Sequence, residues 1–215
     1  MPWMEQLHSA DWTQASWIGL GAYLLGCFTT GYYLIRMRTG QDIRDIGSGS
    51  VGAKNVGRLM GWQGFTLTLI GDFFKGVFAV WVARHFTTDD RIVIIAVLAV
   101  VAGHVWPVQL FFRGGKGMAT SLGVILIYDY HLAVAFLIFF GCAFALLRKT
   151  VLPGLFAFAC LPFVMHYLEH NPAKTCGISL LAALVLIAHR RNLMDEFLHL
   201  LEPREMKPKH NRTKL

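Results

Sequence analysis

The chain contains the stretch LMGWQGFTLTLIGDFFKGVFAVWVA, residues Leu59–Ala83, in which only Asp72 and Lys75 are charged. About 20 predominantly apolar residues in an α-helix cross the roughly 30 Å hydrocarbon core of a bilayer. This stretch is longer, so it predicts a membrane-spanning helix. Of the 215 residues of the chain, 55% are hydrophobic and 15% are charged, and the mean hydropathy is +0.49. A typical soluble domain carries about 25% charged residues, so the composition favours an integral membrane protein.

Further apolar runs lie on both sides of this stretch. They are Ser16–Ile35, Ile92–Phe112, Met118–Tyr128, His131–Leu147, Val151–Leu168 and Thr175–Ala188. Two of them, Met118–Tyr128 and Thr175–Ala188, are short for a bilayer core, and each could be a tilted span, a re-entrant segment or an interfacial helix. We therefore predict an all-α, polytopic integral membrane bundle of about seven transmembrane helices, with five as the alternative.

Charge placement predicts the orientation of this bundle. The formal net charge is +7, and the basic residues gather in short segments between the apolar runs. With the N-terminus outside, seven spans leave only Arg84, Arg91 and Lys174 on the outer side, which satisfies the positive-inside rule. Five spans fit nearly as well, and the Arg36–Arg58 loop, the Arg113–Lys116 loop and the tail lie inside in both arrangements. We expect one membrane domain over residues 1–203, a basic cytoplasmic tail over 204–215, and membrane lipids rather than nucleic acid as partners. The oligomeric state stays open.

The first unusual polar segment is DIRDIGSGSVGAKNVGR, Asp42–Arg58. Its glycines allow close backbone approach, so successive N–H groups could form an anion-binding nest. Lys54 and Arg58 are four residues apart and share one face of a helix that starts there. The formal match to G-x-G-x-x-G follows no predicted strand, which excludes a dinucleotide fingerprint. A flexible basic loop is the alternative.

The second polar segment is GHVWPVQLFFRGGKGMATS, Gly103–Ser121. Glycines and one lysine before a helix form an anion site in which amides, helix dipole and the charge of Lys116 converge. The alternative is that Lys116 only contributes to the positive charge on the inner side of the membrane. For His104, a buried and satisfied side chain is as consistent with the sequence as a catalytic one.

The third polar segment begins at His189, and Glu202 and Pro203 follow it. His189 and Asn192 share a helical face, although a solvated stop-transfer segment would have the same pattern. Inside the second apolar run, Asp72 and Lys75 are three residues apart, and a structural ion pair is favoured over direct substrate contact.

Three polar segments on one side of a membrane, rich in Lys, Arg and glycine amides, indicate phosphate ligands. The sequence lacks a metal-ligand motif and a nucleophile elbow. We therefore expect catalysis by positioning and charge stabilisation, with no metal and no cofactor.

The order of these motifs resembles the bacterial acyl-phosphate:glycerol-3-phosphate acyltransferase family. That family reads G-S-G-N-x-G-A-T-N-x-x-R, then D-x-x-K-G, then G-H-x-x-P-x-x-x-x-F-x-G-G-K-G-x-A-T, then a His, an Asn and a Glu-Pro. The resemblance extends from about Tyr23 to Pro203. The matching positions outside the first loop are Asp72, Lys75, Gly76, Gly103, His104, Pro107, Phe112, Gly114, Gly115, Lys116, Gly117, Ala119, Thr120, His189, Asn192, Glu202 and Pro203.

The resemblance implies an enzyme of the bacterial plasma (inner) membrane whose motifs face the cytoplasm. It would transfer a fatty acyl group from acyl phosphate to glycerol 3-phosphate and form lysophosphatidic acid and phosphate. The implied catalytic residues are Ser48, Arg58, Lys116, His189 and Asn192. The implied substrate-binding residues are Gly47, Gly49, Gly52, Lys54, Asn55, His104, Gly114, Gly115, Gly117 and Thr120.

The chain departs from the family pattern at several positions. Ser50 stands where the family usually has Asn, and Lys54 where it has Thr. The family's R-Y-V-S-L-x-S segment has Val151 and Gly154 in place of both serines. A transporter or binding protein for an organic phosphate or lipid phosphate, without acyl transfer, is the alternative function. An acyl-CoA or acyl-carrier-protein donor is disfavoured, because the sequence has no H-x-x-x-x-D motif.

Overall fold

The computed structural model describes residues 11–201, and over these it is helical without strands. The long elements are α2 (Trp12–Cys27), α3 (Thr30–Thr39), α4 (Ala53–Phe86), α5 (Asp90–Val105), α6 (Met118–Tyr128), α7 (Tyr130–Leu147), α8 (Val151–Glu169), α9 (Pro172–Ala188) and α10 (Arg190–Leu201). Short 3-10 turns lie at Ile43–Asp45 and Val108–Leu110. The predicted end of the membrane domain, with Glu202 and Pro203, and the predicted tail lie outside the described residues.

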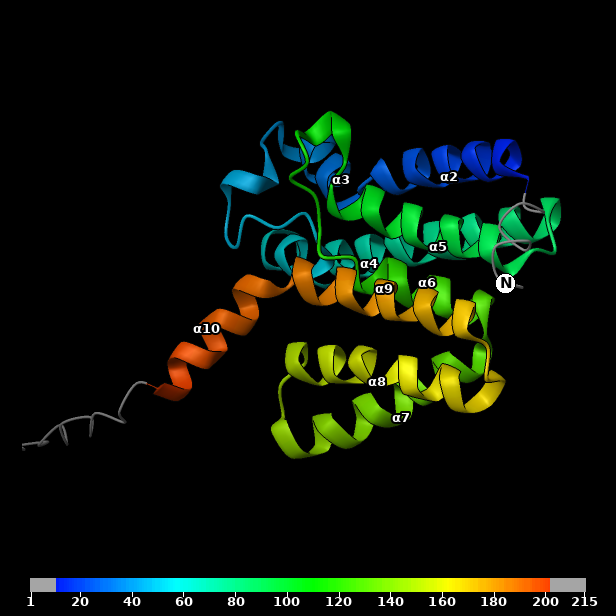
Figure 1. Ribbon diagram of the computed structural model, residues 1–215. Coiled ribbons are helices and arrows are strands. Elements are labelled where there is room, and N and C mark those ends of the chain that lie inside the picture. The colour runs from blue at the N-terminus through cyan, green and yellow to red at the C-terminus, as the bar shows by residue number, and fades with distance from the viewer. Residues whose placement is uncertain (1–10, 202–215) are drawn as a thin grey trace, which may run out of the picture.

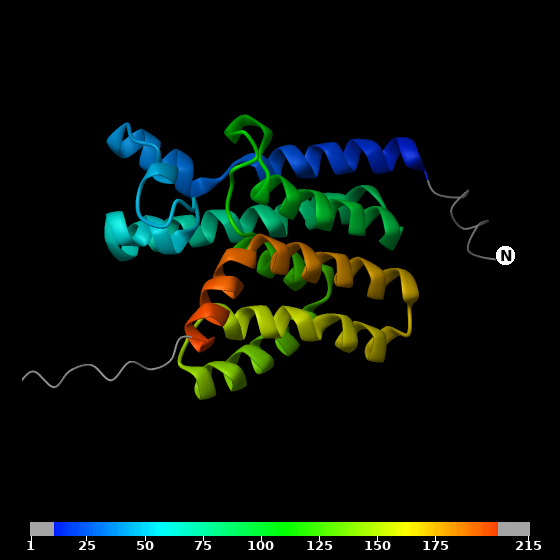
Figure 2. The same cartoon turned by 60° about the vertical axis from the view of Figure 1, so that its left-hand side comes forward.

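The bundle is built from helices that run back and forth side by side (Figures 1 and 2). Among the described residues, 5 segments are long and apolar enough to span a membrane: Trp12–Thr39, Ala53–Phe86, Asp90–Leu110, Tyr130–Leu147 and Val151–Glu169. Two shorter apolar helices, α6 and α9, complete the bundle. The predicted all-α polytopic membrane fold is confirmed, and the two predicted span counts differ only in whether these two helices are included.

Two long segments are interrupted in ways that the apolar runs do not show. The first segment breaks between α2 and α3, where Phe28 and Thr29 adopt extended backbone. Helix α4 begins at Ala53, well before the apolar run, and Gly61 with φ 66° and ψ −161° interrupts its helical backbone. A side chain would be strained at that φ, so glycine permits the break.

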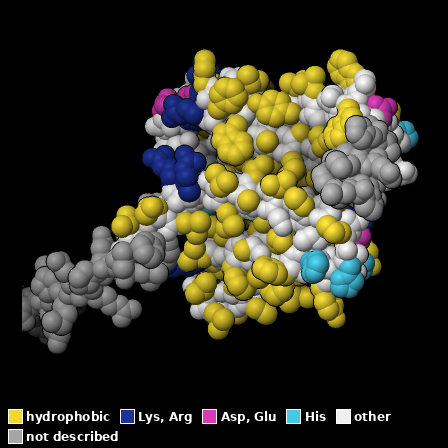
Figure 3. All heavy atoms as spheres, in the orientation of Figure 1, with side chains coloured by type: hydrophobic (Ala, Val, Ile, Leu, Met, Phe, Trp, Pro, Cys, Tyr) yellow, Lys and Arg dark blue, Asp and Glu magenta, His cyan; other side chains and the backbone are white. Residues whose placement is uncertain are grey.

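Close helix contacts depend on small residues. Gly26 of α2 faces the Val100 carbonyl of α5, and Gly123 of α6 faces the Phe73 carbonyl of α4, so a Cβ at either glycine would collide with backbone. In a bilayer the lipid tails are as apolar as the helices, and close packing of small residues supplies much of the association energy. Hydrophobic side chains cover the flank of the bundle in Figure 3, as a lipid-facing surface requires.

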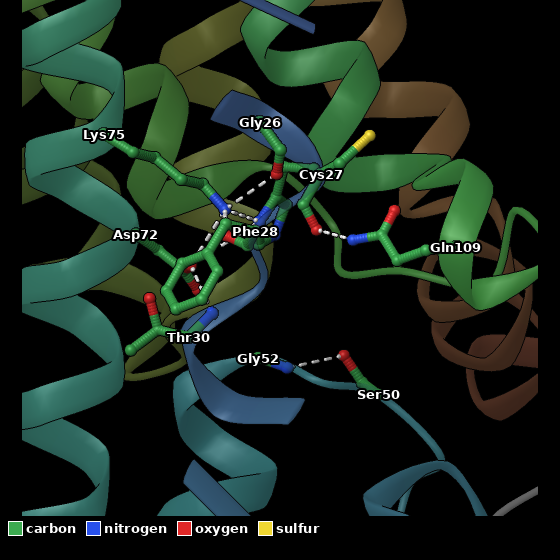
Figure 4. A network of polar contacts seen from close by, with 10 residues as sticks. Gly26, Cys27, Phe28, Thr30, Ser50, Gly52, Asp72, Lys75 and Gln109 are labelled. Atoms are coloured by element: carbon green, nitrogen blue, oxygen red, sulfur yellow. Dashed lines mark hydrogen bonds and ion pairs between the residues drawn. The ribbon is translucent and has the colours of Figure 1, made fainter. Parts of the chain in front are cut away.

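The break after α2 is held by a buried ammonium (Figure 4). Lys75 Nζ donates to the carbonyls of Gly26 (3.2 Å) and Phe28 (2.9 Å) and pairs with Asp72 Oδ1 at 3.0 Å. It also lies 2.7 Å from His104 Nδ1. Carbonyls at a helix end have no partner within the helix, so the predicted ion pair also satisfies the end of α2.

The two ends of the bundle differ in how their cations are paired. At the end with the short connections, Arg84 pairs with Asp90, and Lys174 bridges Asp90 and Glu169. The opposite end carries the loop after α3, the α5–α6 loop, the α7–α8 loop and α10 (Figures 1 and 2). Figure 3 shows Lys and Arg side chains gathered there. All three polar segments found in the sequence therefore meet at one end of the bundle.

Candidate active site

The loop between α3 and α4 is folded around one side chain, Asn55, which is only 1% exposed. Its Oδ1 accepts from the Ser48 amide at 3.0 Å. Its Nδ2 donates to the carbonyls of Ile46 (2.9 Å) and Ser50 (3.0 Å), and more weakly to that of Ile43 (3.4 Å). Asn55 therefore sets the shape of the loop that carries Ser48, and its side-chain amide is hydrogen-bonded to that loop.

The same loop is attached to the α5–α6 loop by Arg44. Its guanidinium forms an ion pair with Asp42 (2.6 Å) and donates to the Leu110 carbonyl at 2.7 Å. The hydrogen bonds from Arg44 lower the pKa of Asp42 below its usual range, so this carboxylate stays ionised and keeps the pair intact. The first and second polar segments are thus fixed relative to each other.

Four glycine amides of these loops already have hydrogen-bond partners within the protein. The Gly49 amide donates to the Ile46 carbonyl (3.1 Å) and the Gly52 amide to Ser50 Oγ (3.3 Å; Figure 4). The amides of Gly114 and Gly115 donate to the last carbonyls of α5 at 3.1 and 3.0 Å. These four amides are therefore not available to an anion.

His104 lies behind the α5–α6 loop rather than at its surface. It is 3% exposed, its Nδ1 faces Lys75, and a Cβ on Gly115 would collide with its Nε2. Thr120 in the first turn of α6 is fully buried, and its carbonyl fits against Gly76 of α4. Both placements favour positioning of the loop and of α6 over direct contact with substrate.

Lys116 and Asn192 are brought together although they are 76 residues apart in the chain, and Lys116 Nζ donates to Asn192 Oδ1. Beside them, His189 caps α9 and is 5% exposed. Burial lowers the pKa of His189 below its usual 6.5, and the charges of Lys116 and Lys54 lower it further. The ring is therefore neutral at pH 7.

The contacts of His189 also select its tautomer. Nδ1 lies 2.8 Å from the Val185 carbonyl, which can only accept a hydrogen bond. Nδ1 must therefore carry the proton, and Nε2 of the neutral ring is left as the acceptor. A neutral imidazole with a free Nε2 lone pair can accept a proton from a hydroxyl group.

Two cavities lie among these groups. One of about 340 Å³ is lined by Arg148, Lys149, Thr150, Val151, Leu152 and Asn192. The other, of about 310 Å³, is lined by Lys54, Gly57, Arg58, Gly61, Trp62 and Phe65. Lys54 Nζ donates to Thr150 Oγ1, so the two linings touch.

Several lining residues were not predicted from the sequence. In the sequence, Arg148 and Lys149 were interpreted only as basic residues on the inner side of the membrane. Thr150 was only part of the segment in which the family's serines are missing. Trp62 is 74% exposed and follows Gly61 directly, and no role was predicted for it within its apolar run. An aromatic residue one helical turn after Arg58, next to a glycine, is the signal that could have identified it.

Comparisons with known proteins find relatives that cover most of the chain. The profile of the family described as glycerol-3-phosphate acyltransferase matches residues 16–197. "Glycerol-3-phosphate acyltransferase 1" of Desulfitobacterium hafniense is 43% identical over 176 residues, 82% of this chain and 87% of that protein. "Glycerol-3-phosphate acyltransferase" of Gloeobacter violaceus is 35% identical over 198 residues, 90% of this chain and 96% of that protein.

Solved structures are similar over the same region. The crystal structure of PlsY (YgiH), an integral membrane glycerol 3-phosphate acyltransferase, in its glycerol 3-phosphate form has a TM-score of 0.79 and 30% sequence identity, and the match covers 89% of this chain and 96% of that one. The lysophosphatidic acid form of that protein gives a TM-score of 0.77 at 29% identity, covering 89% of this chain and 95% of the other.

Proposed function

Because the chain belongs to the glycerol-3-phosphate acyltransferase family, we propose that it acylates glycerol 3-phosphate with an acyl phosphate as donor, by direct transfer and without an acyl-enzyme. The chain is an integral membrane acyltransferase of phospholipid biosynthesis that forms lysophosphatidic acid from glycerol 3-phosphate. The identity of the donor and the roles of individual residues are the proposal. The observation that carries it is the convergence of Lys54, Lys116 and His189, from three distant segments, at one end of the bundle.

The proposed reaction has a simple balance. The primary hydroxyl oxygen of glycerol 3-phosphate attacks the acyl carbon, the bond from that carbon to the phosphate oxygen breaks, and inorganic phosphate leaves with the electron pair. The hydroxyl proton passes to His189 Nε2 or to the departing phosphate. An acyl phosphate is an activated anhydride, so positioning and charge stabilisation suffice.

The two substrates are both anions and repel each other, so the protein must offset their charge. Arg58 and Lys116 are proposed to grip phosphate oxygens, with Ser48 and Asn192 as hydrogen-bonding groups. Gly47, Gly49, Gly52 and Gly117 shape the loops around them. Asn55, His104, Gly114, Gly115 and Thr120 act by holding these loops, since their polar groups or surfaces face the protein.

We also propose that the site faces the cytoplasm of the bacterial inner membrane and that the N-terminus lies outside. The excess of Lys and Arg at the site end supports this orientation, because the other end of the described bundle carries only a few basic residues, Arg84, Arg91 and Lys174. Glycerol 3-phosphate would then enter from the cytosol. The acyl chain of the donor would lie along the apolar flank of the bundle.

The charged pair within a membrane span is the feature that would favour a transporter, and the structure gives that pair another role. A transporter site is expected near the bilayer midplane. Asp72 and Lys75, the charged pair within a span, instead bind each other and the carbonyls at the end of α2. A structural pair therefore accounts for both residues.

The test is a panel of donors with purified protein. Acyl phosphate, acyl-CoA and acyl-carrier protein are each incubated with labelled glycerol 3-phosphate, and the label is followed into a chloroform-soluble product. We expect product with acyl phosphate alone. Product with either thioester donor and none with acyl phosphate would refute the proposed donor.

A matched pair of variants tests the site. Lys116→Ala should lower kcat/KM by roughly 100-fold or more, as does loss of a charge-stabilising donor elsewhere, with little change in detergent melting temperature. Arg113→Ala removes an exposed cation three residues away and should leave activity unchanged. Equal effects of the two substitutions would contradict the role of Lys116.

A further inference from the structure

We propose that Lys54 is a cation shared by the phosphate groups of both substrates, and that Thr150 holds its ammonium at the boundary between the two cavities. The inference rests on the proposed function, because it assigns one cavity to each phosphorylated substrate. It concerns Lys54, at a position where the resembled family usually has Thr.

The geometry places Lys54 between the cavities. The residue lies in the first turn of α4, and its ammonium donates to Thr150 Oγ1 in the α7–α8 loop, 96 residues away in the chain. Lys54 itself lines the cavity of about 310 Å³, and Thr150 lines the cavity of about 340 Å³. Their contact therefore joins the linings of the two cavities.

Both groups retain hydrogen-bonding capacity after this contact. An ammonium has three donors, and the bond to Thr150 uses one of them. The Thr150 hydroxyl accepts that bond and still carries a proton to donate. Thr150 also precedes α8 without forming a side-chain cap there, so helix capping does not occupy its oxygen. The pair can thus present N–H and O–H donors toward phosphate oxygens on either side.

The chemistry of the linings distinguishes the two cavities. Next to Lys54 and Arg58, the smaller cavity has the exposed aromatic rings of Trp62 and Phe65, which suits an anion with an apolar chain, the acyl donor. The larger cavity combines two cations, Arg148 and Lys149, with the amide of Asn192 and the aliphatic Val151 and Leu152, and it has no aromatic ring. We assign it to the acceptor, a small anion that needs no surface for an acyl chain.

Lys54 also lies near the reacting groups. Its charge, like that of Lys116, lowers the pKa of His189, so the ammonium acts on the imidazole proposed to receive the hydroxyl proton. Two phosphate groups bound in the two cavities would repel each other. A cation where the two linings meet attracts both and so offsets part of that repulsion.

The experiment measures KM for each substrate separately in Lys54→Thr, Thr150→Val and the double variant, with Lys54→Arg as the conservative substitution. We expect Lys54→Thr to raise both KM values by about tenfold, the scale of one lost charged hydrogen bond, with kcat little changed. Thr150→Val should raise both by about threefold, and it should have no further effect once Lys54 is Thr. Lys54→Arg should restore most of the affinity.

Several results would overturn the inference. An increase in only one KM would assign Lys54 to one substrate, and independent, multiplying effects of the two substitutions would show that Thr150 does not hold Lys54. A lower melting temperature with unchanged KM values would leave Lys54 a structural role only. Arg113→Ala serves as the charge control and should change neither KM. If the wild-type protein forms no product from acyl phosphate, the proposed function fails, whereas an active wild type with an unaffected Lys54→Thr variant refutes this inference alone.

Discussion

Replacing Asn55 by alanine tests whether the first loop is held in its active shape by one buried side chain. The substitution removes three hydrogen bonds of 2.9 to 3.0 Å, to the Ser48 amide and to the carbonyls of Ile46 and Ser50, and a longer one of 3.4 Å to the Ile43 carbonyl. The backbone of the loop then loses its link to α4. Ser48 would lose the side chain that holds its amide in place.

The size of the effect follows from those bonds. A net hydrogen bond contributes about 1 kcal/mol, and a buried polar group left without a partner costs about 1–3 kcal/mol. The loop groups are only partly buried, so water replaces some of the lost partners. A total of about 2–4 kcal/mol results, which corresponds to a loss of roughly 30- to 1,000-fold in kcat/KM if the loop must be ordered again for each turnover.

The assay measures kcat/KM for glycerol 3-phosphate together with the melting temperature in detergent. The loop can loosen without unfolding the helical bundle, so we expect a large loss of activity and a small drop in melting temperature. Asn55→Asp, nearly identical in volume, should be at least as harmful, because its second oxygen faces two carbonyls. Asn171→Ala is the matched control: it removes bonds of 3.0 and 3.2 Å to the Ala173 and Lys174 amides at the opposite end, and should cost about 1 kcal/mol of stability without affecting activity.

Near-normal kcat/KM in Asn55→Ala would refute the reasoning, since the loop would then keep its shape without this side chain. Normal activity in Asn55→Asp beside an inactive Asn55→Ala would show that volume, and not hydrogen bonding, is what the position requires.

Three further predictions concern the bundle and the imidazole. Gly123→Ala places a methyl group against the Phe73 carbonyl and should destabilise the protein by about 1–3 kcal/mol, seen as a lower melting temperature; an unchanged value would contradict tight α4–α6 contact. Lys75→Met leaves the Asp72 carboxylate and two carbonyls unpaired, and a loss of about 3–5 kcal/mol or failure to fold is expected, whereas a stable variant would argue against the role of the buried ammonium. Because the pKa of His189 lies below 6.5 in the folded protein, the unfolded chain takes up a proton that the folded one resists as the pH falls below 6.5, so stability decreases toward acid. The melting temperature of His189→Gln should fall less than that of wild type between about pH 7 and pH 5, and identical curves would show that His189 titrates normally.

The resemblance in the sequence correctly indicated the family and the activity, and hydropathy indicated the fold. Neither the resemblance nor the hydropathy could show which polar groups form their hydrogen bonds within the protein. The resemblance implied a substrate-binding role for Asn55, His104, Gly114 and Gly115, and in the structure each has a partner or a close contact within the fold. Whether a polar group is exposed or buried depends on the residues that pack against it, and those residues come from distant parts of the chain.

The sequence by itself predicted the apolar runs and the excess of Lys and Arg on one side of the membrane. Both are local properties, because bilayer thickness fixes the length of a span and membrane insertion depends on the charges next to it. The tertiary structure alone decided that Lys116 meets Asn192 and that Lys54 meets Thr150. Those pairings join residues 76 and 96 positions apart. Their existence depends on how α4, α8 and α9 pack and where Gly61 interrupts α4, and no local pattern of hydropathy or charge encodes that geometry.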